Sequence, residues 1–221
     1  LSKEISQWLS WKLVVKRYYL GSKQPSIMSR YFYLAFRIAR RMQRAVAGAV
    51  SSINSIANLF ASLRDNILYL HYLSIGRDRS RIYEKGTTYA TDGSVVIFDR
   101  FPISSLKMPT NSHLLDGPAI QELSSSHPTV FSKRLSEIEQ SIYQKMEIPD
   151  VLVFLDVSPE VSIHRKPDHN EEIIRIKSRT IAQLAELSRD YSDPNPYIII
   201  NADLPYEQVL LSLKRGLWKQ L

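Results

Sequence analysis

Three short and almost wholly apolar runs constrain the fold of this chain more than any other feature of its sequence. They are Val95–Phe98, Val151–Leu155 and the segment "YIIIN" at residues 197–201, and each leads into an aspartate or asparagine. An uninterrupted apolar strand is covered on both faces, which is typical of parallel strands joined by helices. Helical patterns separate the runs, so the sequence predicts a three-layer α/β fold with helices on both faces of a parallel sheet.

Local patterns predict the elements around these strands. The pair Ser158-Pro159 indicates a helix start, because serine caps free N–H groups and proline fits the first helical position. The segment 28–88 contains no proline and is predicted to be mainly helical, with a break near Gly48–Ser52. The length of 221 residues fits one domain. We also expect a strand within Lys12–Gly21 and helices at 1–12, Ala119–Glu122, Val130–Lys145, Asn170–Tyr191 and after Pro205.

Composition and charge limit the classes of function. The chain has no cysteine, which excludes disulfides and thiolate metal sites and favours a cytoplasmic protein. The net charge of +7 suits an anionic ligand such as a nucleotide, and equally nucleic acid or an acidic membrane surface. The five histidines show no metal-ligand spacing with carboxylates, so we expect no structural metal.

The ends and the least charged stretch of the chain bear on its targeting. Ala45–Leu63 carries four serines and two asparagines, so it predicts a buried helix and no transmembrane segment. The N-terminus shows no signal-peptide pattern. The chain begins at Leu1 and not at methionine, which indicates a fragment or a processed chain.

Asp99 and Arg100 stand at the carboxyl end of the first apolar run. In open α/β sheets, ligands bind beside this edge of the strands. An aspartate there can hold Mg²⁺ or accept a hydroxyl proton, and an adjacent arginine can bind a phosphoryl oxygen. The same pair also fits a surface turn with a chance ion pair, and the two residues alone do not decide between these interpretations.

A second charged cluster spans residues 164–179. Asp168 and Glu171 have the spacing of a capping box, and Glu171 and Arg175 have the spacing of a helical ion pair. Arg175 and Arg179 share one helix face, where like charges are unfavourable unless an anion neutralises them. The cluster is either a solvated charged helix or a basic lid over a polyphosphate.

A third cluster, "IGRDRSR", surrounds Asp78 with three arginines. Arg77 and Arg81 share a helix face, and Arg79 points elsewhere. Taken alone, this pattern favours an ordinary charged helix surface.

Three motifs follow one another along the chain: "GRDR" on a helix, "VVIFDRFP" on a strand, and "PDVLVFLDVSPEVSIHRK" followed by spaced arginines. Their order and spacing, together with the ending "YIIINADLPYEQVLLSLKRGL", resemble the thymidylate kinase-like family of P-loop nucleotide kinases. The resemblance covers most of the chain and is weakest between about Gln24 and Asn66. It implies a P-loop nucleoside triphosphate hydrolase-like fold with a helical insertion at about 28–66 and a lid at about 164–179.

The resemblance also implies roles for individual residues. Asp99 matches the acid near Mg²⁺ and the acceptor, and Arg100 matches the arginine on the transferring phosphate. The implied donor is ATP with Mg²⁺, and the implied acceptor is a nucleoside monophosphate or another small hydroxyl or phosphate compound. The resemblance allows a homodimer and makes nucleic acid the less favoured partner. The other implied residues are Arg77, Arg79 and Phe101 on the acceptor side, Arg165, Lys166, Arg175 and Arg179 in the lid, and Asp203 and Leu204 near the adenine.

One required motif is absent from the sequence. Kinases of this family hold phosphates with a glycine-rich loop, G-x-x-x-x-G-K-[ST], and no such motif occurs among the seven glycines. Residues 1–21 resemble the helix that follows this loop and then the second strand, so the loop and the first strand are expected upstream of Leu1. The alternatives are a strand that is supplied otherwise, or a chain that is a decayed relative of the family. That strand would lie between the strands at Val95–Phe98 and Val151–Leu155, leaving an open slot in this chain. We therefore expect little kinase activity from the chain alone.

A second hypothesis comes from another class of protein. Five arginines, at positions 30, 37, 40, 41 and 44, form a basic stripe on the first long helix. The chain can thus be a non-catalytic, kinase-like module that binds an anionic partner, a membrane surface or nucleic acid through its basic helices.

Overall fold

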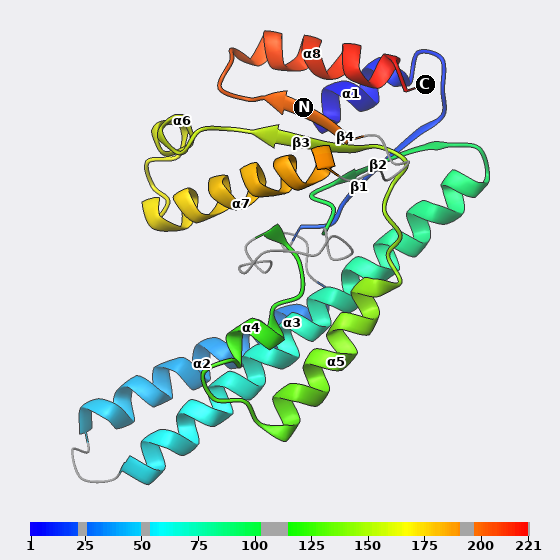
Figure 1. The fold of residues 1–221 in the computed structure, drawn as a ribbon. Helices are drawn as coiled ribbons and strands as arrows, with labels where there is room; N and C mark the ends of the chain where they lie inside the picture. The colour runs from blue at the N-terminus through cyan, green and yellow to red at the C-terminus, as the bar shows by residue number, and fades with distance from the viewer. Residues whose placement is uncertain (22–25, 50–53, 103–114, 191–196, 221) are drawn as a thin grey trace.

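The computed structural model describes residues 1–21, 26–49, 54–102, 115–190 and 197–220. The chain is mixed α/β, with short parallel strands and longer helices (Figure 1). Its elements, in chain order, are α1 (Ser2–Leu9), β1 (Val15–Tyr19), α2 (Ile27–Ala49), α3 (Asn54–Thr91), β2 (Val95–Asp99), α4 (Ile120–Leu123), α5 (Val130–Gln144), β3 (Leu152–Asp156), α6 (Pro159–Arg165), α7 (Glu171–Asp190), β4 (Tyr197–Asn201) and α8 (Tyr206–Trp218).

The strands form two parallel pairs. β1 pairs with β2 from Val15↔Val95 to Tyr19↔Asp99, and β3 pairs with β4. Among the described residues no strand pairing joins β2 to β3, and the predicted parallel strands are present as these two separate pairs. The break in strand pairing lies between β2 and β3, the two strands that the family resemblance places on either side of the missing first strand.

A single apolar core joins the two pairs. Ile5 and Leu9 of α1 pack with Val209 and Leu213 of α8 and with Ile200 of β4. Side chains from every strand pack against this cluster, including residues 95 and 97 of β2 and 153 and 155 of β3. The alternate residues 152 and 154 of β3 belong to another cluster, as the two-residue period of a strand requires. Figure 1 shows α1 and α8 on one side of the strands and α3 and α7 on the other, so helices lie on both sides of the strands.

A helical part extends away from the strands. α2 and α3 pack as an antiparallel hairpin, in which the end of α2 and the start of α3 lie far from the strands, and α5 packs along α3 (Figure 1). Tyr69 and Leu73 of α3 form a buried cluster with Ile120 and Leu135. The predicted helical break lies between α2 and α3, but the prediction that Ala45–Leu63 is buried is wrong, because Leu59 is 67% exposed. No helix in the described ranges is both long and apolar enough to cross a membrane.

The helix caps test two sequence predictions. Ser158 caps α6 with Pro159 at the first helical position, and its hydroxyl accepts a hydrogen bond from Val161 N–H, as predicted. The capping box predicted for Asp168 and Glu171 is wrong. Because α7 begins at Glu171, its N-cap is residue 170, and the Oδ1 of Asn170 accepts the N–H of residue 173 instead.

Candidate functional site

The carboxyl end of β2 meets the first turn of α1. The Ser2 hydroxyl donates a hydrogen bond of 2.9 Å to Asp99 Oδ2, and Arg17 Nη1 donates one of 3.2 Å to the Ser2 hydroxyl. Parallel pairing places Tyr19 beside Asp99, so β1 ends at the same edge. A carboxylate, a hydroxyl and a guanidinium therefore converge where a helix presents its free N–H groups.

Arg100 and Asp116 are the described non-glycine residues with a left-handed backbone, at φ 61° and 64°. Each such residue costs about 1–2 kcal/mol. The two side chains meet, with Arg100 Nη1 3.5 Å from Asp116 Oδ2, and the Arg100 guanidinium lies 5.9 Å from the ring centre of Tyr19. Strained backbone is typical of functional sites, and here it brings Arg100, the predicted phosphate-binding arginine, to the Asp116 carboxylate.

Arg79 is a buried centre of hydrogen bonding, 5% exposed. Its Nε donates to the Leu20 carbonyl at 2.6 Å, Nη2 donates to Asp116 Oδ1 at 2.7 Å, and Nη1 donates to the Asp116 carbonyl and the Tyr143 hydroxyl. Arg79 therefore anchors the end of β1 and positions Asp116. Its predicted contact with an acceptor stays a prediction, because these bonds use most of the five N–H donors of the guanidinium.

Two buried groups on α5 support this arrangement. Glu139 Oε2 accepts the N–H groups of Ala119 and Ile120 at 3.0 and 2.8 Å, and so holds the first turn of α4. Burial raises the pKa of Glu139 to about 7, although these two bonds and the charge of Arg79 oppose the rise. Burial likewise raises the pKa of Tyr143 to about 12, so its hydroxyl remains protonated beside Arg79.

The predicted adenine segment and the start of the predicted lid lie together. Arg165 Nη1 donates to the Ala202 carbonyl at 2.7 Å, and its Nη2 lies 3.4 Å from the carbonyls of Asp203 and Leu204. The Asp203 carboxylate accepts the N–H of Ser158 at 2.8 Å. The loops after β3 and β4 are thus tied at one edge, and the Arg165 guanidinium is committed to backbone oxygens.

The rest of the predicted lid is more exposed. Arg175 pairs with Glu160 at 3.0 Å, an ion pair between α7 and α6 in place of the predicted partner Glu171. Lys166 and Arg179 are exposed. The charged helix is therefore solvated along much of its length, and its closure over a ligand remains a prediction.

Lys177 is a basic residue that the sequence analysis did not select. It is only partly exposed on α7, and burial lowers the pKa of its ammonium group. The charge of Asp116 raises that pKa, and the charges of Arg100 and Lys166 lower it further. Asp116, Arg100 and Lys166 are therefore each within electrostatic reach of Lys177, which adds a cation from α7 near Arg100.

The predicted acceptor residues do not all converge. Arg77 and Arg81 are exposed and Arg79 is buried, which confirms that they occupy different faces of α3. Phe101 packs among aromatic rings, with its ring centre 6.0 Å from Phe98 and 6.1 Å from Tyr83.

Three residues at the site were missed by the sequence analysis. Ser2 stands in the first turn of a helix, Lys177 lies between two selected arginines, and Asp116 precedes Gly117-Pro118, a sequence typical of a turn. Only the turn signal of Asp116 distinguished it locally, because its two arginine partners are distant in sequence.

The donors at Asp99 fit Mg²⁺ in a limited way. Asp99 and Ser2 offer one carboxylate and one hydroxyl, and Mg²⁺ commonly uses one or two carboxylates while phosphates and water complete its shell. The described residues include no group of three or more histidines or acids that could hold a metal ion by themselves.

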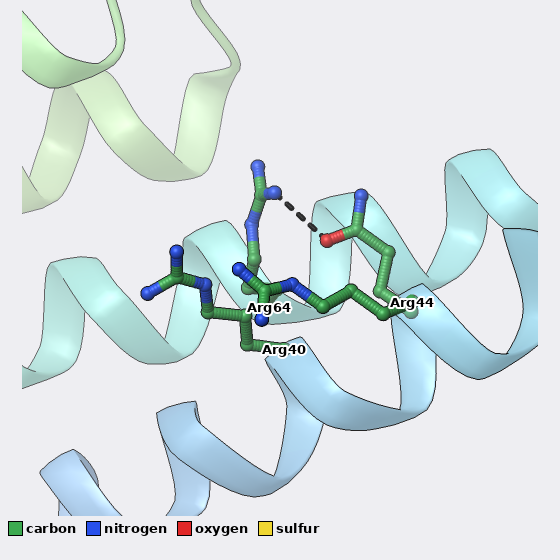
Figure 2. A pocket seen from close by; sticks show the side chains of 4 residues that line it. Arg40, Arg44 and Arg64 are labelled. Carbon is green, nitrogen blue, oxygen red and sulfur yellow. Dashed lines mark hydrogen bonds between the residues drawn. The ribbon is translucent and has the colours of Figure 1, made fainter.

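A separate basic hollow lies on the helical hairpin. Arg40, Gln43 and Arg44 of α2 and Arg64 of α3 line a hollow of about 280 Å³ (Figure 2). Arg64 Nη1 donates to Gln43 Oε1 at 2.8 Å, and its Nη2 lies 2.6 Å from Asp65 Oδ1. Guanidinium groups gathered around an open hollow favour an anion. This hollow lies on the helical hairpin, away from the strand end that carries Asp99.

Comparison with models of known protein families gives no match for this chain. Comparison with curated proteins gives no match either.

Proposed function

We propose that this chain carries the acceptor side and the lid of a thymidylate kinase-like phosphotransferase, which moves the γ-phosphoryl group of ATP to a nucleoside monophosphate or another small hydroxyl or phosphate acceptor. The observation that carries the proposal is the contact of Ser2, in the first turn of α1, with Asp99 at the end of β2. In a P-loop kinase the helix after the phosphate loop starts beside the acid that follows a neighbouring strand.

The division of the strands supports the same proposal. β1–β2 and β3–β4 run parallel within each pair and share the core beneath α1 and α8, yet β2 and β3 are not paired with each other. A strand immediately preceding α1 would fit between them, and the connection from that strand to α1 would cross the edge where Asp99 lies. We propose this as the place of the glycine-rich loop.

Each described group then has a chemical task. Asp99 accepts the acceptor's hydroxyl proton or helps to hold Mg²⁺, which supplies charge neutralisation on the phosphates when bound. Arg100, oriented by Asp116, binds the transferring phosphoryl group through charged hydrogen bonds. Lys177 adds positive charge from α7, and Arg165 fixes the loop of Asp203 and Leu204 beside the donor base.

The first test is the intact mass and N-terminal sequence of the protein from its source. A native chain with an upstream segment ending Gly-Lys-Ser/Thr is the expected result. A native protein that starts at or near Leu1 would overturn the phosphotransferase proposal, because the chain would then have no phosphate loop.

The second test measures transfer from γ-labelled ATP to a panel of nucleoside monophosphates, nucleosides and sugars, using the native-length protein. Asp99→Asn should lower kcat by about 100-fold or more, as expected for loss of acid–base or metal-binding function. Asp92→Asn, at an exposed residue before the same strand, should leave kcat unchanged. Equal activity of the two variants would contradict the assignment of Asp99, and residues 1–221 alone should show little transfer.

A further inference from the structure

An apolar stripe on α2 faces solvent. Ile27, Tyr31, Leu34, Ile38 and Met42 are 46–86% exposed. Steps of three and four residues place them on one helix face, which we call the α2 stripe. The stripe is about 22 Å long at 1.5 Å per residue. Large exposed apolar patches of this kind mark interaction sites.

The flank of the α2 stripe is strongly basic. Arg30, Arg37, Arg40, Arg41 and Arg44 are exposed on α2 and lie to one side of the stripe. The sequence contains no aspartate or glutamate from residue 5 to residue 64. A partner of the stripe therefore meets five arginines and no acidic residue of α2 itself.

The remaining face of α2 is fixed against α3. Ser29 is fully buried and Ala39 nearly so. His71 Nδ1 lies 3.0 Å from the Ser29 carbonyl oxygen, and the Ser29 hydroxyl donates to Asp78 Oδ2. α2 lies on the opposite side of α3 from α5 (Figure 1). Because these bonds fix the rotation of α2, the stripe cannot turn inward to be buried within the described fold.

Near its start, α3 also carries exposed apolar side chains and an arginine. Ile56, Leu59 and Leu63 recur at steps of three and four residues and are 41–67% exposed. The hollow of Arg40, Arg44 and Arg64 lies between the two helices (Figure 2). Exposed apolar side chains and arginine guanidinium groups thus occur together on one projecting element.

We propose that the α2–α3 hairpin binds the surface of an anionic lipid bilayer. The apolar side chains would enter the boundary between headgroups and acyl chains, and the arginines would contact lipid phosphates, as in amphipathic helices that lie in the membrane plane. This inference does not rest on the proposed phosphotransferase activity.

Other anionic partners fit the surface less well. Nucleic acid would use the arginines but would leave the apolar stripe in water. A second copy of the chain, packed stripe to stripe, would bring two sets of arginines together. An acidic helix of another protein needs a groove, whereas the stripe is the outer face of one helix. A fluid bilayer accommodates such a convex face.

The absence of native cysteine allows a direct test. Ile38→Cys on the stripe and Leu211→Cys on α8, at residues of similar exposure, are each labelled with an environment-sensitive fluorophore. With vesicles of phosphatidylcholine containing about 30% phosphatidylserine, we expect a blue shift at position 38 and none at position 211. No shift at position 38, or equal shifts at both positions, would overturn the proposal.

Vesicle co-sedimentation separates the apolar and charged contributions. Arg37→Gln with Arg41→Gln should weaken binding about 25-fold, given about fivefold for each basic residue near an anionic surface. The double control Lys133→Gln with Arg134→Gln removes the same charge from exposed positions of α5 and should change binding little.

The stripe variant Leu34→Ser with Ile38→Ser should weaken vesicle binding at least tenfold while leaving the circular dichroism spectrum unchanged, because both residues face solvent. Equal binding to pure phosphatidylcholine vesicles would contradict the role of the arginines. Two other outcomes would overturn the proposal by assigning the surface to another partner. One is a dimer in analytical ultracentrifugation that dissociates in the stripe variant. The other is binding to RNA, but not to vesicles, that the stripe variant retains.

Discussion

Replacing Glu139 by glutamine should remove a large part of the pH dependence of the chain's stability. Glu139 is 1% exposed, and one of its carboxyl oxygens, Oε1, has no hydrogen-bond partner among the residues that the structure describes. The other oxygen accepts two N–H groups at the start of α4. A glutamine can keep both of these bonds through its carbonyl oxygen, so the substitution changes chiefly the ionisable group.

The size of this pH-dependent contribution to the free energy of unfolding follows from the pKa of Glu139. Burial raises the pKa of Glu139 from 4.5 to about 7 in the folded chain. Each pKa unit is worth about 1.4 kcal/mol, so the difference amounts to about 3 kcal/mol. Below pH 4.5 the residue is protonated in both states and this stability is fully present. As the pH rises through about 7 it is lost, because the unfolded chain releases its proton first.

Urea unfolding followed by circular dichroism at pH 4.5, 5.5, 6.5, 7.5 and 8.5 measures the effect. At each pH, the free energy of unfolding of the unchanged chain is subtracted from that of the Glu139→Gln variant. This difference should rise by about 3 kcal/mol as the pH increases over this range, and it should level off above pH 7. Glu137→Gln, at an exposed position of the same helix, should give a difference independent of pH. A pH-independent difference for Glu139→Gln would refute the argument that burial governs this carboxyl group.

Two further predictions concern packing around the strands. Arg79→Met should lower the free energy of unfolding by about 3–5 kcal/mol, because it removes the buried partner of Asp116. The control Arg77→Met, at an exposed position, should change the free energy of unfolding by less than about 0.5 kcal/mol in the same urea assay. Gly86→Val should lower the free energy of unfolding by about 1–3 kcal/mol, because a Cβ there would lie 2.5 Å from the Phe98 ring. Adding Phe98→Leu to the same chain should recover part of that loss. Strictly additive effects of the two substitutions would show that the residues do not clash.

Much of the element order could be predicted from local sequence. The apolar run at Val95–Phe98 corresponds to β2, and the break near Gly48 corresponds to the separation of α2 from α3. Ser158 and Pro159 begin α6 as expected, because caps depend on residues within one turn. Most of the segment from Arg100 to Pro118 falls outside the described residues.

The site was harder to predict because its contacts join distant segments. Arg79 was expected on a charged helix surface, but it is buried by partners 37 to 64 positions away in the chain. Asp116 and Ser2 acquire their roles only when α3, β2 and α1 come together. Solvent exposure of the α2 stripe could not be inferred either, since an amphipathic pattern is the same whether its apolar face is covered or not.

The pairing of β1 with β2 has a consequence for the order of folding. Val15 pairs with Val95, and the whole α2–α3 hairpin lies between them in sequence. Closing a flexible loop of that length costs about 4 kcal/mol in entropy. The hairpin is made of local contacts, and once formed it shortens the effective loop. We therefore expect the hairpin to fold early and the strand that carries Asp99 to join its neighbour late.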